Sequence, residues 1–74
     1  MTDVLAELRD QLSAFDSVDP DVTLAAAFRT AGLRQVTTAN ELSRIADALI
    51  AQGGVVSLVG RGAKVRAILA GATP

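Results

Sequence analysis

The sequence predicts a mainly α (α+β) fold: a compact three-helix domain followed by a short β-hairpin, or by a strand and a fourth short helix. Apolar side chains recur at helical spacing in three segments, and helix-capping residues stand at their ends. A β-branched run follows the third segment. The 74 residues allow one small domain, which we expect to span 1–74 with residues 72–74 frayed.

The first helix is predicted over residues 3–15, where an apolar stripe recurs every three or four positions. Thr2 or Asp3 can cap its start, because a side-chain oxygen there can accept a hydrogen bond from a free backbone N–H. The stripe consists of Leu5, Leu8, Leu12 and Phe15.

The second helix is predicted over residues 20–31. Asp19 is a favourable N-cap, Pro20 suits the first helical position, and Gly32 is a typical C-terminal stop. Small side chains on its inner stripe would let another helix approach closely. The stripe consists of Leu24, Ala27, Phe28 and Ala31.

The third helix is predicted over residues 39–52 and begins with the clearest local signal in the chain. Thr38 and Glu41 have the spacing of a capping box, in which each side chain accepts a hydrogen bond from the other residue's backbone N–H. A glycine pair at 53–54 ends the helix. Its buried stripe consists of Leu42, Ile45, Ala46, Leu49 and Ile50.

The last third of the chain fits two alternative secondary structures. Residues 55–59 are short, continuous and β-branched, which predicts a strand, and the glycines at 60–62 predict a turn. Residues 63–70 fit either a helix or a second strand. A helix would leave the 55–59 strand to pair with residues 33–37 or with another subunit, because buried backbone groups need partners.

We expect the core to be drawn from the larger apolar residues of all these segments. A chain of this size buries only about 60% of the surface that its unfolded form exposes, so its core is small. The expected core consists of Leu5, Leu8, Leu12, Phe15, Leu24, Phe28, Leu42, Ile45, Leu49, Val56 and Leu58.

The composition argues against an enzyme. The chain has no Cys and no His, so it lacks disulfides, thiolate metal ligands and the commonest general base. The glycines at 60–62 lack the rest of a phosphate-binding fingerprint, and the aspartates at 16–21 lack the glycine and distal glutamate of a calcium loop. We therefore predict no catalytic, cofactor-binding or metal-binding residues.

The leading functional hypothesis is a non-enzymatic protein–protein interaction or assembly module, a small subunit of a homo-oligomer or larger complex. Contacts with other subunits would supply stability that the small core of a single chain lacks. Residues 1–30 carry six acids and two bases (−4), whereas 31–74 carry two acids and five bases (+3), so unlike ends could associate. Pairing could use the edge of the 55–59 strand or the second helix. The candidate interface residues are Leu24, Ala27, Phe28, Ala31, Val55, Val56 and Leu58.

The alternative hypothesis is a small winged-helix-like DNA-binding regulator. Two helices followed by a hairpin match the order of that fold, with basic residues on the hairpin to contact phosphates and part of the third helix to enter the groove. The acidic net charge of −1 weighs against it. The candidate nucleic-acid-binding residues are Asn40, Ser43, Arg44, Arg61, Lys64 and Arg66.

The chain start carries early acids and no apolar run, unlike a secretory signal, and no segment has the length of a membrane span. We therefore expect a cytoplasmic location. The expected partner is the chain itself or another protein, with nucleic acid as the alternative, and neither a membrane nor a small-molecule substrate.

Overall fold

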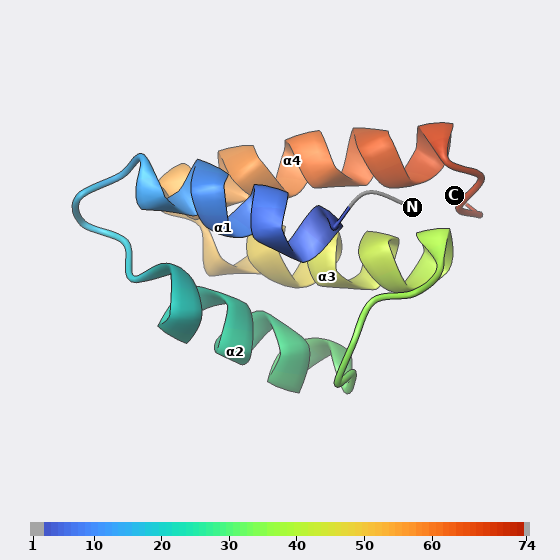
Figure 1. Cartoon of the computed structure of the whole chain (residues 1–74), viewed down its shortest axis with the longest axis horizontal. Helices are drawn as coiled ribbons and strands as arrows, with labels where there is room; N and C mark the ends of the chain where they lie inside the picture. The colour runs from blue at the N-terminus through green and yellow to red at the C-terminus, as the bar shows by residue number, and fades with distance from the viewer. Residues whose placement is uncertain (1–2, 74) are drawn as a thin grey trace.

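A computed structural model describes residues 3–73 and contains four helices within them. They are α1 (Val4–Ser13), α2 (Pro20–Ala31), α3 (Ala39–Gln52) and α4 (Gly54–Leu69). The two longest helices, α3 and α4, form an antiparallel hairpin (Figure 1). Helix α2 packs against α3, and α1 packs against both α2 and α4.

The caps predicted for the first three helices are confirmed. Asp3 accepts a hydrogen bond from Ala6 N at 3.2 Å, whereas Thr2 lies outside the described residues. Asp19 Oδ1 accepts from the backbone N–H groups of residues 21 and 22, and Gly32 ends α2 in the left-handed conformation (φ 69°). These side chains and this glycine satisfy backbone groups that the helices cannot pair internally.

The capping box at the start of α3 is also present. The Glu41 N–H donates to Thr38 Oγ1 at 3.1 Å, and the Thr38 N–H donates to Glu41 Oε1 at 3.1 Å. Glu41 Oε1 additionally accepts from the backbone N–H of Thr37 at 3.0 Å and from its hydroxyl at 2.8 Å. The local sequence thus sets the first residue of the central helix.

The prediction of a strand or hairpin after the third helix is wrong. No strand occurs in residues 3–73, and residues 54–69 are one continuous helix. The chain reverses at Gly53 and Gly54, both with positive φ (75° and 57°). A helix satisfies its own backbone groups, so the problem of an unpaired strand does not arise. Of the two alternatives for residues 63–70, the helix is correct.

Gly60, one of the glycines that predicted a turn, is instead a point of close approach between α4 and α3. A Cβ on Gly60 would lie 2.8 Å from Ile50 N and 2.9 Å from Leu49 Cβ. Ala63 and Ala67 continue the same buried stripe of small residues. Because the side chains on this stripe are small, α4 lies directly on the backbone of α3. The β-branched residues of α4 had instead predicted a strand.

The core gathers around α3, whose inner side is fully covered. Leu12, Leu42, Ile45 and Leu49 are its largest fully buried side chains. Leu8, Leu24 and Val56 are buried as predicted, and Leu5, Phe15 and Phe28 pack at its edge as partly buried residues. Leu58 was predicted to be in the core and is exposed, because a helix at 54–69 turns it away from α3.

The tail after α4 folds back onto the start of α3. Ala72 is buried and donates its N–H to Ala67 O at 2.9 Å. Thr73 N donates to Asn40 Oδ1 at 2.8 Å. Fraying was expected over 72–74; these two residues are held by contacts, and Pro74 lies outside the described residues.

Candidate protein interface

Helix α4 is apolar on two opposite sides, and only one of them is covered. Val56, Val59, Ala63 and Ala67 face α3 and α1 and are buried. The opposite side carries four large aliphatic side chains that remain exposed to 45–83%. They are Leu58 (59%), Val65 (57%), Ile68 (45%) and Leu69 (83%).

Three of these side chains lie on a single line along the helix, with a glycine between them. Leu58, Gly62, Val65 and Leu69 follow one another at intervals of four, three and four residues, which places them on one face. We call these four residues the outer stripe. A Cβ on Gly62 would meet nothing within 4 Å, so the stripe has a gap at its middle.

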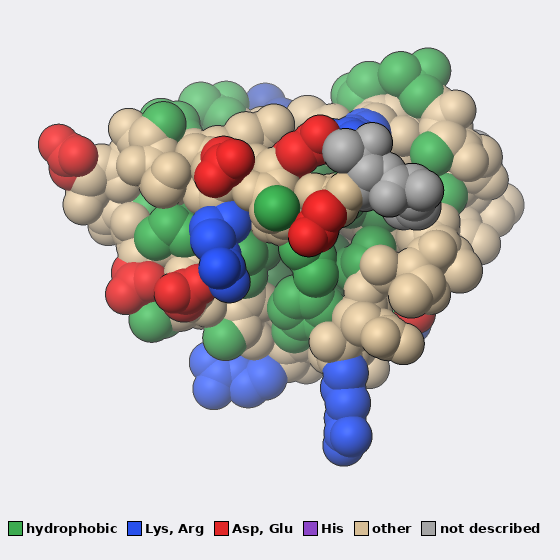
Figure 2. All heavy atoms as spheres, in the orientation of Figure 1, with side chains coloured by type: hydrophobic (Ala, Val, Ile, Leu, Met, Phe, Trp, Pro, Cys, Tyr) green, Lys and Arg blue, Asp and Glu red, His purple; other side chains and the backbone are tan. Residues whose placement is uncertain are grey.

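The outer stripe and Ile68 form the exposed apolar edge of the molecule. In Figure 2, hydrophobic side chains project along the upper edge, where Figure 1 places α4. Among the large exposed apolar residues of the described range, 3–73, only Val22 lies on another helix, α2. Single exposed apolar residues are ordinary, whereas a contiguous set marks an interaction surface or an aggregation hazard.

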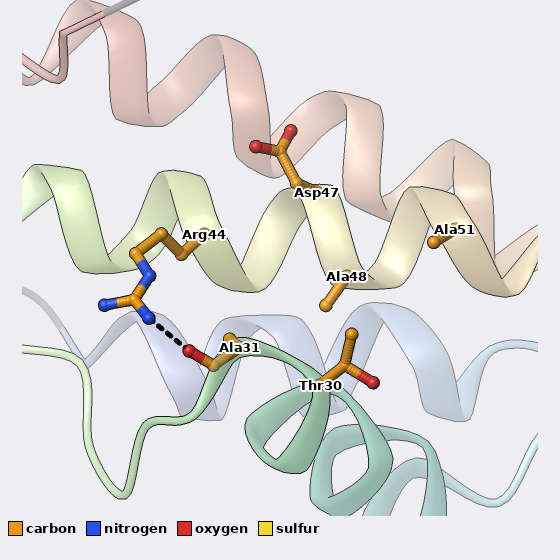
Figure 3. Close-up of a pocket in the computed structure, with 6 residues that line it drawn as sticks. All are labelled: Thr30, Ala31, Arg44, Asp47, Ala48 and Ala51. Carbon is orange, nitrogen blue, oxygen red and sulfur yellow. Dashed lines mark hydrogen bonds between the residues drawn. The ribbon is translucent and has the colours of Figure 1, made fainter.

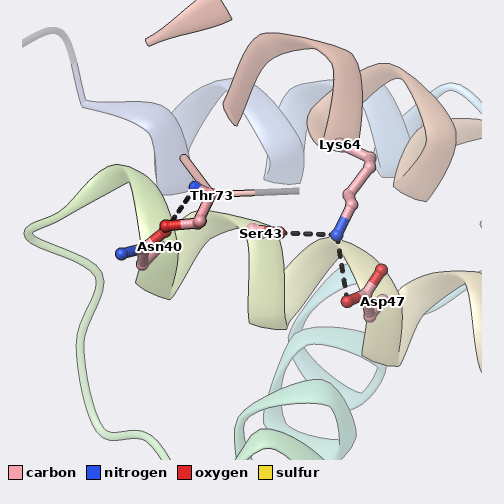
Figure 4. Close-up of polar contacts among 5 residues, drawn as sticks. All are labelled: Asn40, Ser43, Asp47, Lys64 and Thr73. Atoms are coloured by element: carbon pink, nitrogen blue, oxygen red, sulfur yellow. Dashed lines mark hydrogen bonds and ion pairs between the residues drawn. The ribbon is translucent and has the colours of Figure 1, made fainter. Parts of the chain in front are cut away.

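The three charged residues of α4 are all basic, and two are neutralised within the chain. Lys64 donates to Ser43 Oγ at 2.6 Å and to Asp47 Oδ2 at 3.1 Å, bridging α4 to α3 (Figure 4). Arg66 forms an ion pair with Glu7 of α1. Arg61 is exposed and forms no ion pair within residues 3–73. Within the described residues, Arg61 is therefore the basic group of α4 that remains available for an ion pair with a partner, and it lies next to the outer stripe in sequence.

The interface predicted on α2 is mostly occupied by the fold itself. Leu24 and Ala27 are buried, and Phe28 and Ala31 are partly buried against the core. On α4, Val56 is buried and Val55 is half-buried, leaving Leu58 as the predicted interface residue that is exposed. The proposed edge-strand pairing is wrong, because residues 55–59 are helical.

The six candidate DNA-binding residues do not form the predicted arrangement. The wing is absent from the described chain, since residues 60–62 lie inside α4. Five of the six make contacts within the chain: Asn40 with Thr73, Ser43 and Lys64 with each other, Arg44 with the Ala31 carbonyl, and Arg66 with Glu7. Arg61, the sixth, lies in α4 and is exposed.

A hollow lies between α2 and α3. It has a volume of about 290 Å³ and is lined by Thr30, Ala31, Arg44, Asp47, Ala48 and Ala51 (Figure 3). Arg44 points across it and donates to the Ala31 carbonyl at the end of α2. Asp47 is paired with Lys64. Both charged groups are thus engaged in holding the helices together.

A carboxyl group at the start of α3 has a shifted pKa. The backbone N–H and hydroxyl of Thr37, followed by those of Thr38, hold the pKa of the Glu41 carboxyl below its usual range. Within residues 3–73, no three acidic side chains come close enough to hold a metal ion. The same residues contain no helix long and apolar enough to span a bilayer.

Val65, Ile68 and Leu69 were not predicted as interface residues, because residues 63–70 fitted either a helix or a strand and only the helix puts them on one exposed side. The signal that could have found them was the second stripe, since 56, 60, 63 and 67 already account for one buried side. Comparisons with family models, with curated proteins and with solved structures found no match to this chain.

Proposed function

We propose that this chain is a non-enzymatic protein–protein interaction module that assembles through the outer side of α4. The observation that carries the proposal is that α4 is apolar on both sides while its own fold covers only one. A helix that is hydrophobic all round is normally buried all round.

The size of the exposed surface makes its burial energetically significant. Fully burying one large aliphatic side chain contributes about 1.5–3 kcal/mol. Covering four that are 45–83% exposed would contribute on the order of 5 kcal/mol. At about 0.05–0.15 kcal/mol per residue, a domain of 74 residues has a total stability of about 4–11 kcal/mol, so such a contact would matter to the fold as well as to the partner.

A helical partner suits this surface best. The outer stripe is a narrow line of residues spaced as in helix–helix seams, and Gly62 leaves room for a side chain from the other helix. DNA binding is not favoured by a particular observation, since Lys64 and Arg66 are already paired with acidic residues.

The test is site-specific photocrosslinking in extracts of cells that naturally make the chain. A photoreactive residue replaces Leu69, and in a matched control it replaces Val22, which is similarly exposed (62%) but lies on α2. We expect a defined protein adduct from position 69, identified by peptide mass, which Val65→Lys abolishes. Equal or absent labelling at both positions would overturn the proposal.

A further inference from the structure

The outer stripe has a spacing that is self-complementary. Its intervals of four, three and four residues read the same in both directions along the helix. If two copies of α4 pack antiparallel, Leu58 therefore lies level with Leu69 of the second copy. Gly62 then lies level with Val65, and the same contacts repeat on the other side of a two-fold axis.

The gap at Gly62 fits the side chain that this register brings to it. Gly62 has no Cβ and open space in front of it, whereas Val65, one turn further on, projects into solvent. In the antiparallel register each Val65 sits over the bare backbone of the opposite Gly62. Small residues at a seam allow close helix approach, so the missing side chain at Gly62 leaves room for Val65 of the second copy.

Charge selects the antiparallel orientation over the parallel one. Arg61 and Arg66 flank the outer stripe on opposite sides, five residues apart. In a parallel pair, flanking positions five residues apart face each other, so Arg61 would meet Arg66 of the second copy on both sides. In the antiparallel pair, Arg61 instead lies beside Ile68 of the second copy. The aliphatic part of the Arg61 side chain can cover the apolar surface of that isoleucine. Each Arg66 stays with Glu7 of its own chain.

We propose that the partner of this face is a second copy of the same chain, bound through an antiparallel α4–α4 contact centred between Gly62 and Val65. This proposal rests on the proposed function. The stripe runs over twelve residues, from Leu58 to Leu69, and its two ends are eleven positions apart, or about 16 Å. The buried area would be on the order of 1,000 Å² in total, at the low end of specific interfaces, so the dimer is weak.

The first experiment measures self-association of the purified chain by sedimentation equilibrium from about 10 µM to about 1 mM. We expect the mass to rise from one copy towards two. Val65→Lys should weaken association about a hundredfold or more, because it buries an unpaired charge in each half. The matched control Val22→Lys should leave it unchanged.

A second variant tests the register. Gly62→Val adds an apolar side chain to the face but fills the space that Val65 of the second copy occupies. We expect association to weaken at least about tenfold while the helix content stays the same. Unchanged or tighter association would overturn the register, because a face that binds by general hydrophobicity would gain from the added methyls.

Orientation is tested with thiols, because the chain has no Cys of its own. Leu58→Cys and Leu69→Cys chains are mixed and treated with a short bismaleimide. We expect crosslinks between the two variants, and few within either variant, where the thiols would lie about 16 Å apart. Crosslinks within each variant instead would overturn the antiparallel pairing. A chain that remains a single copy throughout overturns self-association, whereas a position-69 adduct with a different protein would leave the proposed function standing.

Discussion

Gly60 of α4 lies against the backbone of Ile50 in α3, so closely that a Cβ at position 60 would stand 2.8 Å from the Ile50 nitrogen. The neighbour is backbone, which cannot rotate away. Two residues further along, Gly62 faces open space. The two glycines of one short motif therefore have opposite environments, and their substitution should have opposite effects.

The first prediction compares Gly60→Ala with Gly62→Ala. Gly60→Ala should lower the free energy of unfolding by about 1–3 kcal/mol, because the helices must move apart. Gly62→Ala should raise it by about 0.5–1 kcal/mol, since alanine costs less chain entropy in a helix. Urea unfolding at low micromolar concentration measures both. Stabilisation by Gly60→Ala would show that α4 does not lie on α3 as described.

The second prediction separates the two sides of the hairpin. Leu49→Ala should lower the free energy of unfolding by about 2–5 kcal/mol, because Leu49 is fully buried and its removal leaves a cavity. Leu58→Ala should change it by no more than about 0.5 kcal/mol in dilute solution, because that side chain is exposed. Thermal melting of the two variants checks the difference, and similar losses would place Leu58 back in the core.

The third prediction concerns the cap of α3. Thr38→Ala should lower the free energy of unfolding by about 1 kcal/mol, because the Glu41 N–H loses its acceptor. Thr30→Ala, at an exposed position within α2, is the control and should stay within about 0.5 kcal/mol of the parent. Equal effects from the two substitutions would argue against a specific role for the capping box.

The fourth prediction is a pH dependence carried by Glu41. Hydrogen bonds from Thr37 and Thr38 lower the pKa of its carboxyl in the folded state. The stabilisation is therefore complete above the unfolded pKa of about 4.3 and is lost as the pH falls through the lower folded value. Glu41→Gln does not titrate, so its unfolding free energy should fall less steeply than that of the parent below about pH 4.3. Parallel curves for the two proteins would contradict this.

The bounds of α1, α2 and α3 were largely readable from the sequence, because their signals are local. A cap such as Asp19 or Thr38 acts on backbone groups two or three residues away, and Gly32 ends its helix through its own φ. The central stripe from Leu42 to Leu49 likewise lies on one side of a single helix. Such features depend on the chain nearby and need no knowledge of the rest of the fold.

Helix α4 could not be read in this way. Its β-branched run and its glycines favour a strand and a turn locally. The contact of Gly60 with α3, which is distant in sequence, is consistent with a helix instead. The exposed side of α4 is equally non-local, since Leu58 and Val65 are surface residues only because α3 covers the opposite side. The sequence determined where α2 and α3 begin and end, through bonds within a few residues, whereas the first helix was predicted over 3–15 and α1 ends at Ser13. The packing of α4 on α3 decided which apolar stripe is core and which is left for a partner, because burial depends on what the rest of the chain covers.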